Sequence, residues 1–160
     1  MGASYTRVGR GTAMIALRNF CVEDALDLQR WMFSDLTIEA IRSMISDWNR
    51  GTYEGMYFEM LAIVQEKTLV GMISLYQHSA DEIGIGPQVF EAHRRQGIAT
   101  QAMRLAMALA KEKGYRIVSQ QIRTNNEASI ALHQCLDFEA SGDPYRNAKG
   151  NEVVDYRKVL

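Results

Sequence analysis

One stretch of the chain constrains the fold more than any other, because it joins a strand to a helix through a basic, glycine-containing turn. The segment 82–90 is strand-like, although Pro87 within it indicates a bulge or a bend. The segment 97–113 is rich in Ala, Met and Leu, which favour a helix, and Gly114 ends it. A strand that leads directly into a helix favours a mixed α/β fold.

Hydrophobic periodicity places the other elements of the chain. Apolar runs predict strands at 14–17, 56–65, 68–77, 115–122 and 153–160, with a smaller one near 138–140. Apolar spacings of three and four residues predict amphipathic helices at 21–32 and 37–48, and an asparagine cap predicts another helix at 126–136. The polar pair Glu66–Lys67 separates two of the strands and predicts a hairpin. No linker or repeat divides this order, so we expect a single domain over residues 14–160.

The first thirteen residues lack the pattern of the rest. They are small, polar and basic, without the hydrophobic core of a secretory signal. Because Met14 opens the patterned region, we expect residues 1–13 to be a flexible leader, with addition in cloning or a misassigned start as its hypothetical origin.

Composition excludes several classes of protein. A hydrophobic content of 47% with 23% charged residues excludes wholesale disorder, and a formal net charge of −1 gives no general attraction to nucleic acid or to an anionic membrane. Cys21 and Cys135 lie far apart, which excludes a disulfide scaffold and a thiolate zinc site and suits a reducing cytosol. No apolar run is long enough to span a bilayer. We therefore expect a cytoplasmic protein without a membrane or nucleic-acid partner.

The turn at 93–100, with the sequence HRRQGIAT, carries the chemistry that the sequence suggests. Small residues at a strand-to-helix turn let backbone N–H groups approach an anion, and the helix N-terminus adds partial positive charge. Arg94 and Arg95 add full charges, so the turn suits phosphate or pyrophosphate. The alternative is an ordinary basic loop. No Gly-Lys-Ser/Thr tripeptide and no three spaced glycines are present, which excludes the two common nucleotide-binding loops.

Two motifs resemble those of the GNAT family of N-acetyltransferases. Arg94-x-x-Gly97-x-Ala99 matches the family's Gln/Arg-x-x-Gly-x-Gly/Ala signature at a strand–helix junction. The segment 123–133, RTNNEASIALH, resembles the family's arginine-x-serine-asparagine motif and the helix that follows it. The next residues are Leu-Asp-Phe at 136–138, where Leu-Gly-Phe is usual. The resemblance implies an α/β (α+β) GNAT fold, with a central mixed, mostly antiparallel sheet of six to seven strands flanked by four helices.

The resemblance also implies a function: transfer of an acetyl group from acetyl-CoA to a primary amine, by direct attack in a ternary complex. The acceptor would be a small-molecule amine or a protein N-terminus, and the chain could form a homodimer. Backbone N–H groups around the turn would hold the CoA pyrophosphate, and the end of the preceding strand would pair with the pantetheine arm and polarise the thioester carbonyl. The residues that match these roles are Val89, Phe90, Glu91, Arg94, Arg95, Gln96, Gly97, Ile98, Ala99, Thr100 and Asn126.

The acid and base are less clearly marked. His133 stands where the family commonly has a tyrosine that protonates the departing thiolate, and an imidazole is able to do the same. Its alternative role is that of a half-buried helix residue. Glu82 is the first candidate for the general base, since Gln121 stands where some relatives carry a glutamate. The three histidines lack the spacing of a metal site, so we expect no metal.

The acceptor side is marked only by composition. Residues 53–58 are the candidate for one rim of an acceptor cleft, and residues 143–147 are the candidate for the opposite rim or an ordinary hairpin loop. Two rival functions stay open: a CoA-binding sensor without turnover, and a nucleic-acid module that uses the basic segment 93–95. The sequence pI near 6.3 counts against the second rival.

Overall fold

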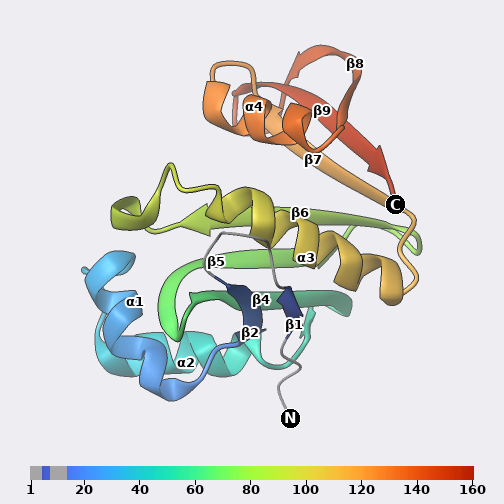
Figure 1. Cartoon of the computed structure of the whole chain (residues 1–160). Coiled ribbons are helices and arrows are strands. Elements are labelled where there is room, and N and C mark those ends of the chain that lie inside the picture. Colours follow the sequence, from blue (N-terminus) through green and yellow to red (C-terminus); the bar gives the residue numbers. More distant parts are fainter. Residues whose placement is uncertain (1–4, 8–13) are drawn as a thin grey trace.

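Residues 5–7 and 14–160 are described by the computed structural model, and they build one mixed sheet flanked by helices (Figure 1). The strands are β1 (Tyr5–Arg7), β2 (Ile15–Asn19), β3 (Thr52–Tyr53), β4 (Met56–Gln65), β5 (Thr68–Gln77), β6 (Glu82–Val89), β7 (Ile117–Arg123), β8 (Glu139–Arg146) and β9 (Glu152–Val159). The α-helices are α1 (Ala25–Trp31), α2 (Ile38–Trp48), α3 (Ile98–Glu112) and α4 (Glu127–Cys135), with 3-10 turns η1 (Val22–Asp24) and η2 (Glu91–His93). The sheet order is β1-β2-β4-β5-β6-β7-β9-β8, with β3 paired to β4.

This architecture confirms the predicted fold class. Every strand pair is antiparallel except β6–β7, so the described sheet is mixed and mostly antiparallel. It has nine strands rather than six or seven, because the short β1 and β3 were not expected. Strand β1 falls inside the expected leader and pairs with β2, whereas residues 1–4 and 8–13 lie outside the described residues.

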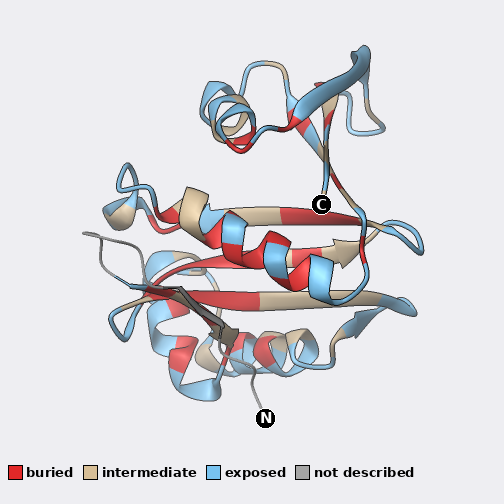
Figure 2. Cartoon of the chain, turned by 45° about the vertical axis from the view of Figure 1, so that its right-hand side comes forward, coloured by how far each residue is buried: buried red, intermediate tan, exposed pale blue. Residues whose placement is uncertain are grey.

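The sheet separates two hydrophobic cores (Figure 2). Helices α3 and α4 cover one face, where Ile98, Ala102 and Ala106 of α3 pack on the central strands. Helices α1 and α2 cover part of the other face through Leu28, Ile41 and other buried residues. The amphipathic pattern is therefore satisfied on both sides of the sheet.

The predicted helix at 21–32 divides into η1 and α1 at Asp24, a buried residue that is paired with the partly buried Arg18. The Asp24 carboxylate is only 7% exposed, and it accepts hydrogen bonds from both terminal nitrogens of Arg18, at 2.8 and 2.9 Å. It also accepts the backbone N–H of Cys21 at 2.8 Å. Burial alone would raise the pKa of Asp24, but these hydrogen bonds outweigh it and hold the pKa below its usual value.

The bulge predicted at Pro87 is absent from the β5–β6 ladder, whose register is continuous from Gly71↔Val89 to Gln77↔Ile83. The hydrogen bond from Phe90 N–H to the Val70 carbonyl sets the phase of this ladder. Odd-numbered residues of β6 consequently direct their backbone groups toward the other edge. Pro87 lacks an N–H group, but its nitrogen faces away from β5, so no hydrogen bond to β5 is lost. This explains why a proline fits in a regular strand.

Strands β6 and β7 pair over only two residues and then diverge. The parallel register is Glu82↔Ile117 and Ile83↔Val118. Beyond these pairs β7 continues with β9, and the edge of β6 from Ile85 to Val89 faces a gap. Figure 1 shows the two strands separating toward the end of the sheet at which helix α3 begins. This β6–β7 gap positions the site.

Candidate active site

The turn that leads from β6 into α3 presents backbone donors on one side. Arg95 and Gly97 have positive φ values of 64° and 75°, and Gly97 is the N-cap of the helix. The first helical bond runs from Gln101 N–H to the Gly97 carbonyl, so the N–H groups of the first helical turn have no acceptor within the helix. A helix N-terminus of this kind attracts an anion through its oriented N–H groups and its dipole.

A cavity of about 710 Å³, here called the turn cavity, opens beside these donors. It is lined by the end of β6, by the turn with the start of α3, and by the start of α4. The predicted cofactor residues that line it are Val89, Arg94, Arg95, Gly97, Ile98, Ala99, Thr100 and Asn126. Among the described residues of its lining, the charged side chains are two arginines and no carboxylate, so the field in the cavity favours an anion.

Three predicted cofactor residues lie outside this lining. The Phe90 side chain is fully buried against α1 and stacks on Trp31, and its N–H is bonded within the sheet. Glu91 is exposed at the start of η2, and Gln96 is exposed in the turn.

The Arg94 side chain connects the turn to strand β6 through a hydrogen bond. Its Nε donates to the Val89 carbonyl oxygen at 3.0 Å. Val89 is one of the odd-numbered residues of β6, so this carbonyl faces the gap. The guanidinium is therefore held at the mouth of the turn cavity, next to the strand edge.

Gln120 of β7 occupies the closed end of the gap, which is the end next to the two paired residues of β6 and β7. Its Oε1 accepts the Ile85 N–H at 3.2 Å and the Tyr76 hydroxyl at 3.1 Å. The Tyr76 ring lies over Gly84, where a Cβ atom would come within 2.3 Å of it, so this strand position requires glycine. Burial raises the pKa of Tyr76.

Sequence reasoning missed both Gln120 and Tyr76. Their hydrogen bond joins residues 44 positions apart, so no local spacing reveals it. The sequence offered one signal, the two glycines Gly84 and Gly86 within a strand, because glycine inside a strand often marks the close approach of another group.

A second cavity, here called the polar cleft, lies on the sheet face opposite α3. It encloses about 210 Å³ and is lined by Tyr76, His78, Glu82, Ser119, Gln120, Gln121, Asp155 and Arg157. Glu82 Oε1 lies 3.9 Å from Arg157 Nε. Tyr76 and Gln120 belong both to this cleft and to the closed end of the gap, so the two faces of the sheet meet at these side chains.

Asp155 belongs to a hydrogen-bonded network that extends from the polar cleft into the β8–β9 hairpin. Its Oδ1 accepts the Tyr145 hydroxyl at 2.8 Å, and Gln121 Nε2 donates to the same hydroxyl oxygen at 2.8 Å. Asn147 Nδ2 donates to Gln121 Oε1 at 2.7 Å. The hydrogen bond to Asp155 raises the pKa of Tyr145. Tyr145 and Asn147 lie within the segment 143–147 that the sequence marked as a candidate rim.

His133 lines neither cavity. Its side chain is 2% exposed, its Nδ1 lies 2.7 Å from the Ser129 carbonyl oxygen, and its ring packs edge-on against Phe138. A carbonyl only accepts, so Nδ1 carries the hydrogen and Nε2 has a lone pair. Within the described part of the chain, Nε2 is buried without a hydrogen-bond partner. Burial lowers the pKa of His133, with the Ser129 contact opposing, so the ring is held neutral.

The backbone explains this placement. Phe138 N–H bonds to the His133 carbonyl and Asp137 N–H bonds to the Gln134 carbonyl, which together form a Schellman motif at the end of α4. Such motifs pair a hydrophobic residue after the helix with one inside it, and here Phe138 and His133 form that pair. Asp137 occupies the left-handed position, with φ of 64°, where the family pattern has glycine.

Asp137→Gly is expected to stabilise the protein. A left-handed conformation costs an ordinary residue about 1–2 kcal/mol, and part of that gain is lost to the greater backbone entropy of unfolded glycine. We therefore expect a rise of about 0.5–1 kcal/mol in the free energy of unfolding, measured by urea denaturation. Asp137→Ala is the control, and it should lower stability, because alanine also lacks the local hydrogen bonding that lets Asp tolerate this conformation.

The family comparison agrees with this geometry. Residues 21–138 match the family model described as the acetyltransferase (GNAT) family. This match places the chain in the class of acetyltransferases. The chain belongs to the GNAT family. Comparison of the sequence with curated proteins gave no match.

Solved structures share the fold at low identity. RimJ from Mycobacterium smegmatis, in complex with CoA-disulfide, is 16% identical with a TM-score of 0.80, over 98% of this chain and 87% of that one. RimL, a ribosomal L7/L12 alpha-N-protein acetyltransferase in complex with coenzyme A, is 18% identical with a TM-score of 0.80, over 96% and 97%. An acetyltransferase from Salmonella typhimurium that modifies the N-terminal serine of L7/L12 is 18% identical with a TM-score of 0.78, over 94% and 96%.

Among residues 5–7 and 14–160, no helix combines the length and apolar character needed to cross a bilayer. In the same ranges, no three His, Cys, Asp or Glu side chains gather in a way that could hold a metal ion.

Proposed function

We propose that this chain transfers an acetyl group from acetyl-CoA to a primary amine, by direct attack within a ternary complex. One observation carries the proposal: an anion-binding turn opens onto the β6–β7 gap, whose closed end is shared with a polar cleft on the other face. A donor over the turn and an acceptor in the cleft would therefore meet at the gap. The similar RimJ and RimL structures, which contain CoA, support this assignment.

The donor site follows from the turn cavity. The N–H groups of Ile98, Ala99 and Thr100 would bind the pyrophosphate, with Arg94 and Arg95 balancing its charge. The edge of β6 at Val89 offers an N–H and a carbonyl to an extended pantetheine arm, which would pair there as an added strand. Arg94 would then exchange the Val89 carbonyl for a phosphate oxygen.

The chemistry needs a base on the acceptor side and an acid near sulfur. The amine nitrogen attacks the thioester carbonyl carbon, and the C–S bond breaks. The nitrogen releases one proton to the base, and the CoA thiolate takes up one proton from the acid, so the number of protons is conserved. Glu82 in the polar cleft would accept the proton from nitrogen, directly or through water. The Tyr76 hydroxyl, at the closed end of the gap, is better placed than His133 to protonate the thiolate.

Calorimetric titration and thiol release test this function together. Acetyl-CoA is expected to bind with micromolar affinity, and a panel of primary amines should contain at least one that releases free thiol at a rate proportional to enzyme. Tyr76→Phe and Glu82→Gln should each lower kcat by about 10²-fold or more, with acetyl-CoA affinity within threefold of the wild type. A folded protein that binds no acetyl-CoA would contradict the proposal.

His133→Phe separates the structural role of His133 from a catalytic one. Phenylalanine keeps the ring contact with Phe138 and removes a buried nitrogen that has no partner in the described chain. We expect kcat within about threefold of the wild type, because proton transfer by a real acid contributes at least about 10²-fold. The folded-state pKa of His133 is depressed, so the native protein loses stability as pH falls below about 6.5, and the variant should lose less. A 10²-fold lower kcat would instead mean that His133 acts as the general acid.

CoA binding without turnover is the second candidate function. The burial of His133 outside both cavities favours it, because the position that the family uses for an acid contributes none here. In that case acetyl-CoA would bind with the same affinity, and no amine in the panel would release thiol.

A further inference from the structure

The middle of the β6–β7 gap offers hydrogen-bond acceptors but no backbone donor. The β5–β6 ladder directs the backbone groups of Ile85, Pro87 and Val89 into the gap. The Ile85 N–H already donates to Gln120 Oε1, at 3.2 Å. Pro87 has a carbonyl but no N–H. Between Ile85 and Val89, this edge of β6 can therefore accept hydrogen bonds but cannot donate one.

The arm of acetyl-CoA would bring groups of both kinds to this edge. The amide N–H groups of pantetheine are donors, and they suit the carbonyl oxygens of Ile85 and Pro87. The thioester carbonyl is an acceptor only, and its oxygen gains negative charge when the amine attacks. Val89 lies about 13 Å from Ile85 along the strand, at about 3.3 Å per residue, so its N–H is too far from the Tyr76 hydroxyl for both to reach one thioester. A thioester near Tyr76 therefore needs a donor from a side chain.

The side-chain amide of Gln120 has a donor in this position. Its Oε1 accepts the Ile85 N–H and the Tyr76 hydroxyl, and a backbone N–H can only donate, so these contacts fix which end of the amide is oxygen. A Cβ atom on Gly86 would lie 3.7 Å from Nε2, which places Nε2 beside the middle of the gap. Gln120 is half-buried, and its Nε2 makes no hydrogen bond within residues 5–7 and 14–160.

The same contacts hold the amide in place before any ligand arrives. The two donors to Oε1 come from different strands, Tyr76 from β5 and Ile85 from β6, so the amide is held at two points. An amide whose oxygen accepts hydrogen bonds becomes a stronger donor through its nitrogen. A donor that is fixed in advance stabilises developing charge without a cost of reorganisation.

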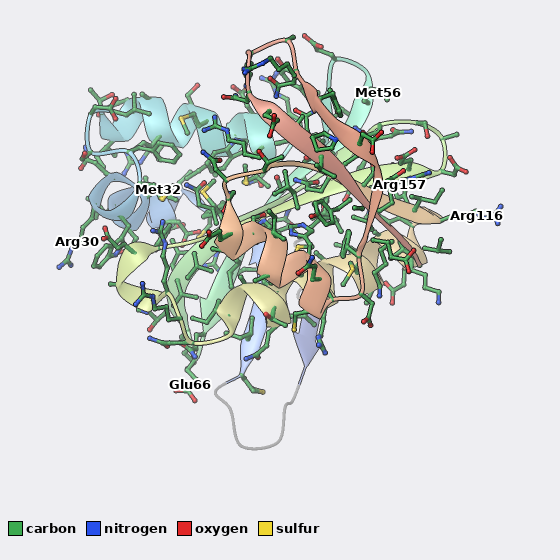
Figure 3. The ribbon with its side chains drawn as sticks, turned by 90° about the horizontal axis from the view of Figure 1, so that it is seen from above. Arg30, Met32, Met56, Glu66, Arg116 and Arg157 are labelled. Carbon is green, nitrogen blue, oxygen red and sulfur yellow. The ribbon has the colours of Figure 1, made fainter. Side chains whose placement is uncertain are left out.

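The place of the amide along the gap agrees with this role. In Figure 3, Arg116, which precedes β7 at the closed end of the gap, lies on the opposite side of the molecule from Arg30 of α1. The residue after Arg30, Trp31, stacks on Phe90, which follows β6 at the other end of the gap. Gln120 is near the closed end and also lines the polar cleft, where the proposed donor and acceptor sites meet.

We propose that Gln120 Nε2 donates the hydrogen bond that stabilises the thioester oxygen during acetyl transfer, in place of the N–H that Pro87 lacks. When the amine nitrogen attacks, the electrons of the C=O double bond move onto this oxygen. They return to re-form the carbonyl as the C–S bond breaks and sulfur leaves with the electron pair of that bond. Nε2 keeps its protons throughout. The proposal rests on the acetyltransferase function above and adds a catalytic residue to it.

Gln120→Glu removes the Nε2 donor and keeps the shape of the side chain. The carboxylate can still accept the Ile85 N–H and the Tyr76 hydroxyl. We expect kcat to fall about 10²–10³-fold, as for the loss of one donor to a developing oxyanion. Gln120→Met should lose kcat to a similar extent, although it adds no charge. Gln134→Glu, at an exposed position of α4 outside the turn cavity and the polar cleft, is the matched control and should keep kcat within about threefold.

A pair of ligands tests the hydrogen bond without turnover. S-ethyl-CoA has a CH₂ group where acetyl-CoA has its carbonyl. In calorimetric titrations, the wild type should prefer acetyl-CoA about fivefold, which corresponds to about one neutral hydrogen bond, and Gln120→Met should bind the two within about twofold of each other. Infrared spectra of bound, isotope-labelled acetyl-CoA should show the thioester carbonyl stretch at a lower frequency in the wild type than in Gln120→Met. Tyr76→Phe should keep both the preference and the frequency, although it lowers kcat.

Pro87→Ala tests the same inference from the strand and does not depend on the folding of the Gln120 variants. Alanine adds a backbone N–H that faces the gap next to Gly86. A carbonyl oxygen can accept two hydrogen bonds, so the preference for acetyl-CoA over S-ethyl-CoA should rise about threefold. An unchanged preference would mean that the thioester oxygen lies elsewhere, which overturns the proposal.

Two further results would overturn the inference and leave the acetyltransferase function standing. One is a kcat within about threefold of the wild type in both Gln120 variants. The other is a loss of kcat in Gln120→Met with the ligand preference and the carbonyl frequency unchanged, because Gln120 would then act only by holding Tyr76. A folded wild type that binds no acetyl-CoA would instead contradict the proposed function itself.

Discussion

Gly97→Asp is expected to weaken acetyl-CoA binding by at least about 10²-fold. The substitution places a carboxylate at the N-cap of α3, where it would accept the N–H groups proposed for the pyrophosphate and repel its charge. The loss of several hydrogen bonds to a charged group, at about 1.5–3 kcal/mol each, accounts for the factor. Calorimetric titration of acetyl-CoA into the folded variant measures it.

The control for this variant must reproduce its backbone strain. Gly97 has φ of 75° with open space around the position of a Cβ atom, and Gly142 in β8 has φ of 83° with the same open surroundings. Gly142→Asp therefore carries similar strain far from the turn cavity. Its acetyl-CoA affinity should stay within threefold of the wild type. Equal binding by both variants would remove the turn from the donor site.

Asp24→Asn is expected to lower the free energy of unfolding by about 2–4 kcal/mol. The variant leaves the Arg18 guanidinium partly buried without its bidentate carboxylate, and it changes an acceptor of four hydrogen bonds. Urea denaturation at pH 7 measures the loss. Arg50, whose pair with Asp47 is exposed, provides the control, because Arg50→Gln should cost less than about 1 kcal/mol.

The same pair gives a pH dependence with a defined sign. The folded-state pKa of Asp24 is lower than its unfolded value of about 3.9, so the unfolded chain binds a proton first. The stability that Asp24 contributes is complete above about pH 5 and is lost as pH falls through the unfolded-state pKa and then the folded-state pKa. The difference in stability between wild type and Asp24→Asn should therefore shrink below pH 4. A constant difference down to pH 2 would contradict the depressed pKa.

Local signals were sufficient for most of the fold. The strands at 56–65 and 68–77 have the predicted bounds, because alternation and the polar Glu66–Lys67 turn are both local features. Thr37 and Asn126 cap helices through their own side chains, at 3.1 Å in each case, which the residue type indicates directly. The strand β8 was expected only near 138–140, because its exposed residues include Gly142 and Pro144 and show no alternation.

The site was predictable only where a motif defines it. The turn at 94–100 combines a residue pattern with a position between strand and helix, so the sequence could name the residues of the proposed donor side, most of which line one cavity. Tyr76, Gln120 and Asp155 came together through strand pairing over long separations, which no single sequence displays. For His133 the motif supplied a position on α4 but not the direction of the side chain, which the Schellman end of the helix determines.

Strands β6 and β7 share only a narrow parallel contact, here called the seam, which joins the two parts of the sheet. Two residue pairs, the Gln120 side chain and the Glu82–Arg157 contact cross this seam, whereas β4 and β5 pair over eight positions. Amide hydrogens of β7 and β9 should therefore exchange through a lower-energy opening than those of β4 and β5. A ligand lying in the gap would connect β6 with β7, where the two strands form no hydrogen bonds to each other. Its binding free energy would therefore add to the stability of the C-terminal third of the chain.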